Sequence, residues 1–247
     1  FSDGDFVYNV NDNFNFNVSS YDYLEPLSTK VREGIVPGLK NFLTENGNKV
    51  INITGYYKSD EENNSAFPNL GLARANAVKN YFVSQEIPSS QINTMGKLMD
   101  DMVPKGNVYM GPVAYGIDLV SENAEDELKA LYDKIVANPL VLYFDTAEAS
   151  INLSAEQRQK FADIARYLDK VPKAKSEIVG YTDNEGKRST NKKLGQERAD
   201  FAKAYLMRNG ISENRINTKS KGQNDPIANN NTEEGRAKNR RTVITIK

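Results

Sequence analysis

The most constraining feature of this 247-residue sequence is an internal repeat. The segment Ile-Thr-Gly-Tyr at residues 53–56 returns as Ile-Val-Gly-Tyr at residues 178–181, an offset of 125. Six further matches recur at an offset of 124: Leu70, Arg74, Ala75, Tyr81, Ile87 and Ile92 pair with Leu194, Arg198, Ala199, Tyr205, Ile211 and Ile216. One residue inserted in the intervening loop explains the change of offset. Two copies of one structural unit are therefore the economical interpretation.

The second copy, residues 140–247, is predicted to alternate strands and helices. Ser154, with Gln157 three residues later, resembles a capping box, and apolar residues follow it at helical spacing. Gly210 is suited to the position just beyond a helix end. Strands are expected at 140–144, 176–181, 216–220 and 242–246, and helices at 154–169, 190–209 and from 232.

The first copy follows the same order less regularly. We expect a strand near 13–18, a helix at 27–46 with a kink or a break at Pro37, a strand at 50–56, a helix at 69–85, an irregular stretch at 95–111 and a strand at 113–120. Residues 122–137 form a predicted helix between the copies. The fold class is therefore α+β: two tandem β-α-β-α-β sandwiches, residues 1–120 and 140–247, joined by a helical connector at 121–139.

Composition excludes most catalytic chemistry. The chain contains no His and no Cys, which removes the commonest general base and metal ligand and all thiolate chemistry. Its net charge of −1 argues against general nucleic-acid binding. Acidic residues are scattered among Lys and Arg, without a recognisable catalytic pair. We expect no enzyme, no cofactor and no metal site.

The ends of the chain carry little information about location. The start at Phe1 shows no signal peptide, so we expect a mature form or an excised piece. No run of about 18 apolar residues is present, so no membrane-spanning helix is expected.

Three motifs in the second copy stand out: Gly-Tyr-Thr-Asp at 180–183, Leu-x-x-x-Arg-Ala at 194–199 and Gly-Arg-Ala-x-Asn-Arg-Arg at 235–241. They resemble the OmpA-like peptidoglycan-binding domain, the module shared by outer-membrane porin tails, Pal lipoproteins and MotB flagellar stators. The match covers about residues 140–247, and residues 13–120 resemble the family more weakly. The resemblance implies non-covalent binding to the peptide stem of peptidoglycan at diaminopimelate. It also implies a periplasmic location, with association to the outer membrane through a segment outside this chain.

The resemblance also assigns site residues. Asp183 and Arg198 match the acid and arginine that grip the ligand, and Asn191 matches the supporting amide. The assignment suits diaminopimelate, because an ammonium and a carboxylate on one carbon require an anion and a cation close together. Asn191 and Arg198 are two helical turns apart and share one face, with Leu194 between them. Thr182, in the turn, and Thr146 and Ala147, after the first strand, complete the predicted ligand-binding set.

The first copy departs from this pattern. Lys58 replaces Asp183 and Phe67 replaces Asn191, and only Arg74 keeps its counterpart. Two cations near one ammonium would repel it by about 4 kcal/mol at 4 Å and an effective dielectric of 20. The acids at 60–62 would substitute for the missing counterpart of Asp183 only if their loop folds back. We therefore predict an OmpA-like fold without the usual binding site in residues 1–120.

Three functions remain open at this stage. The first is a peptidoglycan-binding module that tethers an envelope component to the cell wall. The second is a structural subunit of an envelope complex, in which residues 1–120 dock a protein partner. The third, an enzyme acting on the wall, has no supporting residues.

The same residues also have possible roles that are purely structural. Asp183 could be an ordinary turn acid, and Arg198 a solvated or salt-bridged side chain. Of Arg240 and Arg241, strand alternation predicts that one faces outward, and at least one is expected to pair with an acid and brace the fold.

Overall fold

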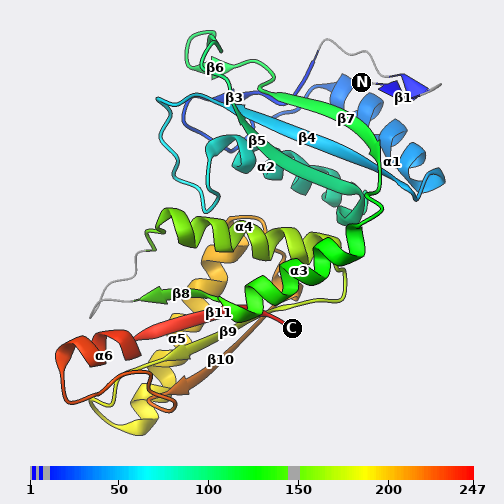
Figure 1. Cartoon of the computed structure of the whole chain (residues 1–247). Coiled ribbons are helices and arrows are strands. Elements are labelled where there is room, and N and C mark those ends of the chain that lie inside the picture. Colours follow the sequence, from blue (N-terminus) through cyan, green and yellow to red (C-terminus); the bar gives the residue numbers. More distant parts are fainter. Residues whose placement is uncertain (1, 4–5, 8–11, 144–150) are drawn as a thin grey trace. The chain divides into compact units, whose positions relative to one another are not determined.

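The computed structural model describes residues 2–3, 6–7, 12–143 and 151–247. The chain divides into two compact units, unit 1 (Phe1–Glu125) and unit 2 (Asp126–Lys247), and the division falls inside helix α3 (Ala124–Ala137). Each unit combines a mixed β-sheet with packed helices (Figure 1). The predicted α+β class is confirmed.

The sheet of unit 2 contains four strands in the order β10-β9-β11-β8. The strands are β8 (Leu140–Tyr143), β9 (Ser176–Tyr181), β10 (Ile216–Gly222) and β11 (Arg241–Ile246). β9 and β10 are parallel, whereas β11 runs antiparallel to both β9 and β8. The apolar side chains on the core face of these strands, among them Leu142, Ile178 and Ile244, are buried. This burial explains why short β-branched and apolar runs form the sheet here.

Helices α4 (Ala155–Lys170), α5 (Arg188–Arg208) and α6 (Glu233–Asn239) complete unit 2. The Ser154 hydroxyl accepts a hydrogen bond from the Gln157 backbone N–H, and the Gln157 side chain accepts one from the Ser154 N–H, which confirms the capping box. Phe161, Ile164 and Leu168 of α4 are buried, as their spacing predicted. A 3₁₀ turn, η3 (Glu213–Arg215), leads from α5 into β10.

The main sheet of unit 1 contains three strands, in the order β5-β4-β7. These are β4 (Lys49–Tyr57), β5 (Ile92–Leu98) and β7 (Val113–Leu119), with β5 parallel and β7 antiparallel to β4. Helices α1 (Val36–Glu45) and α2 (Leu70–Ser84) share one hydrophobic core with β4. β4, β5 and β7 thus repeat the pairing of β9, β10 and β11, which agrees with the repeat found in the sequence.

Short elements surround the sheet of unit 1. A π-helical stretch, η1 (Lys30–Ile35), precedes α1. The chain was predicted to kink or break at Pro37, but it stays helical there: the change from π-helix to α-helix falls at Val36, and Pro37 lies in the first turn of α1. A 3₁₀ turn, η2 (Ser89–Gln91), leads into β5. β1 (Ser2–Asp3) pairs with β2 (Phe6–Val7), and β3 (Phe16–Asn17) pairs with β6 (Val108–Tyr109).

Two expectations for unit 1 need correction. Residues 95–111 were predicted to be irregular, but β5 extends to Leu98 and β6 lies within the stretch. The strand expected near residues 13–18 is reduced to β3, which pairs with β6 and not with the main sheet. The Asn13 side chain instead donates a hydrogen bond to the Val113 carbonyl of β7, 2.8 Å away. The Asn13 side-chain amide thus satisfies a backbone carbonyl of the edge strand β7.

Close packing of two glycines recurs in both units. A Cβ atom built on Gly180 of β9 would lie 1.8 Å from the Gly195 carbonyl oxygen of α5. A Cβ atom on Gly55 of β4 would lie 2.0 Å from the Gly71 carbonyl oxygen of α2. Only glycine permits such an approach of helix to strand. The contact therefore sets the height of α5 above β9, and of α2 above β4.

Candidate ligand-binding site

Asp183 lies just beyond the carboxyl end of β9. The preceding Thr182 is buried, its N–H donates to the Gly222 carbonyl at 2.9 Å, and its hydroxyl donates to the Asp183 carbonyl at 2.8 Å. The Asp183 carboxylate accepts a hydrogen bond from the Glu185 N–H at 3.2 Å, which closes a short turn. The backbone thus fixes the direction of the Asp183 side chain, which remains 14% exposed.

Arg198 reaches the same end of β9 from the middle of α5. Its side chain is largely buried, and Nη1 donates to the Tyr181 carbonyl at 3.2 Å. Burial lowers the pKa of the Arg198 guanidinium, the charge of Asp183 acts in the opposite direction, and the charge of Arg240 adds to the lowering. Arg198, Asp183 and Arg240 therefore form one electrostatically coupled group.

Asn191 connects α5 to the turn that carries Asp183. Its side-chain amide donates to the Asp183 carbonyl at 3.3 Å and to the Gln223 side-chain oxygen at 2.9 Å. The residue is buried, whereas Leu194, one helical turn further along α5, is 37% exposed. The structure thus brings Thr182, Asp183, Asn191 and Arg198 together and leaves an apolar side chain accessible on the same helix. Thr146 and Ala147 lie outside the described residues.

Arg240 belongs to this cluster, although the sequence prediction gave it only a bracing role. Its Nη1 donates to the Asp183 carboxylate at 3.0 Å and its Nη2 donates to the Glu233 carboxylate at 2.7 Å. Burial opposes the charge of Arg240, but the hydrogen bonds to Glu233 and Asp183 outweigh it and raise its pKa. Glu233 and Arg240 are two helical turns apart, and that spacing was the available signal for this pair. The predicted pairing with an acid is confirmed.

The alternation expected for Arg240 and Arg241 is wrong. Arg240 is the C-cap residue of α6, and β11 begins only at Arg241, so strand alternation does not govern the pair. Both side chains are buried. The Arg241 guanidinium stacks 3.9 Å from the Tyr181 ring centroid and donates to the Asp225 carbonyl at 3.0 Å. Arg241 therefore braces the strand that carries the site from the other side.

Comparison with known proteins identifies the architecture. A model of the OmpA family matches residues 26–104 and 143–240, which together make up more than half of the chain. The chain belongs to the OmpA family. The resemblance noted in the sequence is thereby confirmed for both units, and membership agrees with the prediction that the chain is not an enzyme.

Several relatives within the family are similar to this chain. The probable lipoprotein YiaD of Escherichia coli (strain K12) is 32% identical over 144 residues, which is 55% of this chain and 65% of that protein. Outer membrane protein A of Bordetella avium is 37% identical over 127 residues, 51% of this chain and 64% of that protein. The chain therefore spans slightly less than two thirds of these relatives. The crystal structure of the peptidoglycan-associated lipoprotein from Burkholderia pseudomallei is 28% identical, covering 45% of this chain and 92% of that chain with a TM-score of 0.40.

Unit 1 of this OmpA-family chain has a different arrangement at the equivalent place. Arg74 of α2 is fully buried, and its Nη1 donates to the Tyr56 carbonyl at 2.9 Å, the same contact that Arg198 makes with Tyr181. The guanidinium also pairs with the Glu61 carboxylate, whose side chain is 1% exposed. The loop after β4 therefore folds back onto the arginine, the condition under which an acid at 60–62 would compensate for Lys58.

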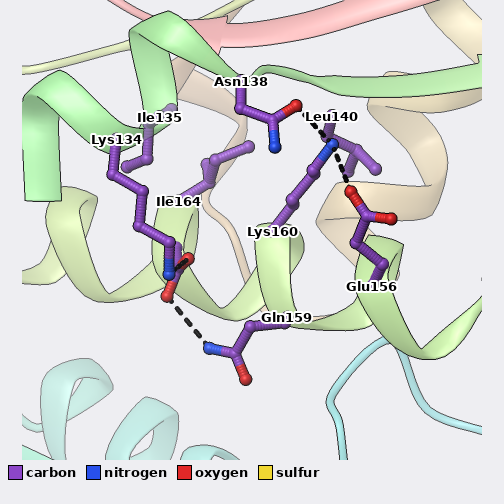
Figure 2. A pocket seen from close by; sticks show the side chains of 9 residues that line it. Lys134, Ile135, Asn138, Leu140, Glu156, Gln159, Lys160 and Ile164 are labelled. Carbon is purple, nitrogen blue, oxygen red and sulfur yellow. Dashed lines mark hydrogen bonds and ion pairs between the residues drawn. The ribbon is translucent and has the colours of Figure 1, made fainter.

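A separate small pocket of unit 2 lies between α3, α4 and the start of β8 (Figure 2). Its volume is about 100 Å³, and Ile135, Leu140 and Ile164 form its apolar wall. Lys160 donates to the Asn138 side chain at 2.7 Å and pairs with Glu156 at 3.0 Å across the opening (Figure 2). Lys134 and Asp163, which also line the pocket, form a second ion pair at 2.7 Å, so the charged groups of this wall are paired with one another.

The described residues were also compared with the requirements of a metal site and of a membrane-spanning helix. In the described part of the chain, no cluster of three or more acidic side chains is arranged to hold a metal ion. No helix there has the length and apolar character that a membrane span requires. The candidate site at the end of β9 consists of the charged side chains of Asp183, Arg198 and Arg240 and the side-chain amide of Asn191.

Proposed function

We propose that this chain binds peptidoglycan non-covalently, with unit 2 holding the zwitterionic end of diaminopimelate in the peptide stem. The ligand ammonium contacts Asp183 and the ligand carboxylate contacts the Arg198 guanidinium. The observation that carries the proposal is that the Arg198 guanidinium is held at 3.2 Å on the carbonyl of Tyr181, two residues before Asp183, so that two opposite charges converge at the carboxyl end of β9. Such a pair matches a group with an ammonium and a carboxylate on one carbon.

The contacts of Asp183 are compatible with this role. Arg240 and the Glu185 N–H each contribute one hydrogen bond to the carboxylate. A carboxylate accepts about four hydrogen bonds, so Asp183 can serve Arg240 and a ligand ammonium together. Arg240 in turn is held by Glu233, which keeps the carboxylate oriented before the ligand arrives. In the proposal, Arg240 is a positioning residue, Asn191 holds the turn, and Leu194 contacts the aliphatic stem of the ligand.

The relatives support the same class of ligand. The peptidoglycan-associated lipoprotein of Buchnera aphidicola is 34% identical over 121 residues, and the peptidoglycan-binding protein ArfA of Mycobacterium bovis is 42% identical over 83 residues. Both of these proteins are named for peptidoglycan, and several other relatives are named outer membrane proteins. We therefore propose that the chain works in the periplasm and tethers an envelope component, associated with the outer membrane, to the cell wall.

Co-sedimentation with purified diaminopimelate-containing sacculi tests the proposal. Asp183→Ala and Arg198→Ala should each weaken binding at least about thirty-fold, because a lost desolvated charge contact costs about 2–5 kcal/mol. Glu197→Ala and Lys193→Ala are charge-matched controls on the exposed face of α5, and both should bind like the parent. Parent-like sedimentation of the Asp183 and Arg198 variants would show that the proposed site is wrong.

The second candidate is a docking function for unit 1, with an envelope protein as the partner. Large apolar side chains are exposed on and after β5, including Met95, Leu98, Val103 and Met110. A monomeric surface exposes such residues singly, and their gathering in one stretch favours a contact. Association with an envelope protein that persists in the Asp183 and Arg198 variants, but is lost when Met95 and Leu98 are both replaced by Ser, would support this alternative.

A further inference from the structure

The arginines of the two units occupy equivalent positions. Arg74 and Arg198 are 124 residues apart, and each donates Nη1 to the carbonyl of the tyrosine that follows the strand glycine, at 2.9 Å and 3.2 Å. The same Gly–Gly contact sets the height of the helix that carries each arginine. Within its own unit, each guanidinium is therefore aimed at the space beside the carboxyl end of β4 or β9.

In unit 1 this space contains the carboxylate of Glu61. Arg74 forks onto it, with Nη1 3.0 Å from Oε2 and Nη2 2.5 Å from Oε1. The backbone N–H groups of Ser19 and Lys58 each donate to the same carboxylate at 2.9 Å. Four donors from three separate segments thus converge on one carboxylate, an arrangement typical of a receptor for a bound anion.

The walls of this receptor exclude water. The ring centroids of Phe16 and Tyr109 lie 5.6 Å and 5.3 Å from the Arg74 guanidinium carbon, and both aromatic residues are buried. Arg74 Nε donates to the Ser20 carbonyl at 3.0 Å, which fixes the plane of the fork. The Arg74 guanidinium is therefore held in place by contacts that do not involve Glu61.

The two offsets of the repeat place different residues of unit 2 opposite Glu61. The offset of 125 that relates the two Gly-Tyr pairs places Gly186 opposite Glu61. Gly186 has a φ of +87°, and a Cβ atom built on it would meet nothing within 4 Å. The offset of 124 that relates the helices places Glu185 there, and its carboxylate lies 4.0 Å from the Arg236 guanidinium.

We propose that Glu61 is an intramolecular ligand: unit 1 contains a carboxylate-binding site that its own chain occupies. The ligand class of this site, once emptied, is a small carboxylate anion. In the parent protein Glu61 competes with any external carboxylate at very high effective concentration, so unit 1 takes no ligand there. The inference concerns unit 1 alone and does not depend on what unit 2 binds.

Chemical rescue in the whole 247-residue chain tests the inference. Glu61→Ala should lower the melting temperature of unit 1, and sodium formate or acetate should restore it in part, whereas sodium chloride at the same ionic strength should not. At ten times the dissociation constant of the anion, the recovery should be roughly 3–5 °C. The parent chain and Glu62→Ala, which removes an exposed acid of the same loop, should respond equally to formate and chloride.

A second variant separates rescue from general effects of salt. Glu61→Gln fills the same space with an amide and should show no formate-specific recovery. A folded Glu61→Ala variant that responds to formate no more than the parent would overturn the proposal. If Glu61→Ala does not fold in chloride, the yield of folded protein in formate is the readout, and equal failure in both salts would overturn it as well.

Discussion

Replacement of Gly180 by Ala tests the physical basis of the candidate site. The added Cβ would lie 1.8 Å from the carbonyl oxygen and 2.7 Å from the carbonyl carbon of Gly195. Both are backbone atoms, so no side-chain rotation relieves the clash. Non-bonded carbon and oxygen atoms need more than 3 Å, so α5 must move away from β9 by more than about 1 Å.

The energetic consequence follows from that movement. Overpacking of this kind costs about 1–3 kcal/mol. The shift also strains the hydrogen bond from Arg198 to Tyr181, and a bond from a charged donor contributes about 1.5–3 kcal/mol. We expect Gly180→Ala to destabilise unit 2 by about 3 kcal/mol, and to weaken sacculus binding because Arg198 no longer aligns with Asp183.

Thermal unfolding combined with hydrogen exchange read by peptide mass spectrometry measures this effect. Exchange should accelerate in β9 and α5 and remain unchanged in β4 and α2. Gly55→Ala should produce the converse pattern, since its Cβ would lie 2.0 Å from the Gly71 oxygen. Gly116→Ala in β7, where a Cβ meets nothing within 4 Å, is the neutral control. A Gly180→Ala protein with parent-like melting and parent-like exchange would refute the close-packing argument.

Two further predictions follow from local contacts. Burial disfavours the charged form of Glu61, but hydrogen bonds from Arg74, Lys58 and Ser19 outweigh this effect and lower its pKa. The stability that Glu61 contributes is therefore present above about pH 4.5 and is lost as the pH falls below that value. In urea unfolding, Glu61→Gln should flatten this loss of stability at acid pH, and an unchanged pH dependence would contradict the argument. Ser154→Ala removes the cap of α4 and should cost about 0.5–2 kcal/mol in urea unfolding without changing sacculus binding, whereas loss of binding would show that α4 contributes to the site.

Much of the architecture was predictable because it depends on local pattern. The matched Gly-Tyr segments and helical arginines indicated two copies, and α4 with its capping box appears where Ser154 and Gln157 placed it. β5 was missed because only Ile92 in its Ile-Asn-Thr-Met-Gly-Lys-Leu sequence is buried, so the strand has no apolar alternation. Its parallel pairing with β4, which no local pattern encodes, stabilises it.

The candidate site divides in the same way. Spacing along one helix was enough to place Asn191 and Arg198 on a common face, and the turn motif was enough to place Asp183 at the end of a strand. Arg240 could not be assigned to Asp183 from sequence, since 57 residues separate them and only the return of β11 beside β9 brings them within 3.0 Å.

The amino-acid sequence by itself determined the duplication, the order of helices and strands in unit 2, and the residue types available for binding. These features depend on the periodicity of apolar residues and on short motifs of neighbouring residues. Tertiary structure alone decided which charges meet: Asp183 with Arg240 in unit 2, and Glu61 with Arg74 in unit 1. A buried charge is stable only with a partner and hydrogen bonds around it, and the fold of distant segments decides which partner that is.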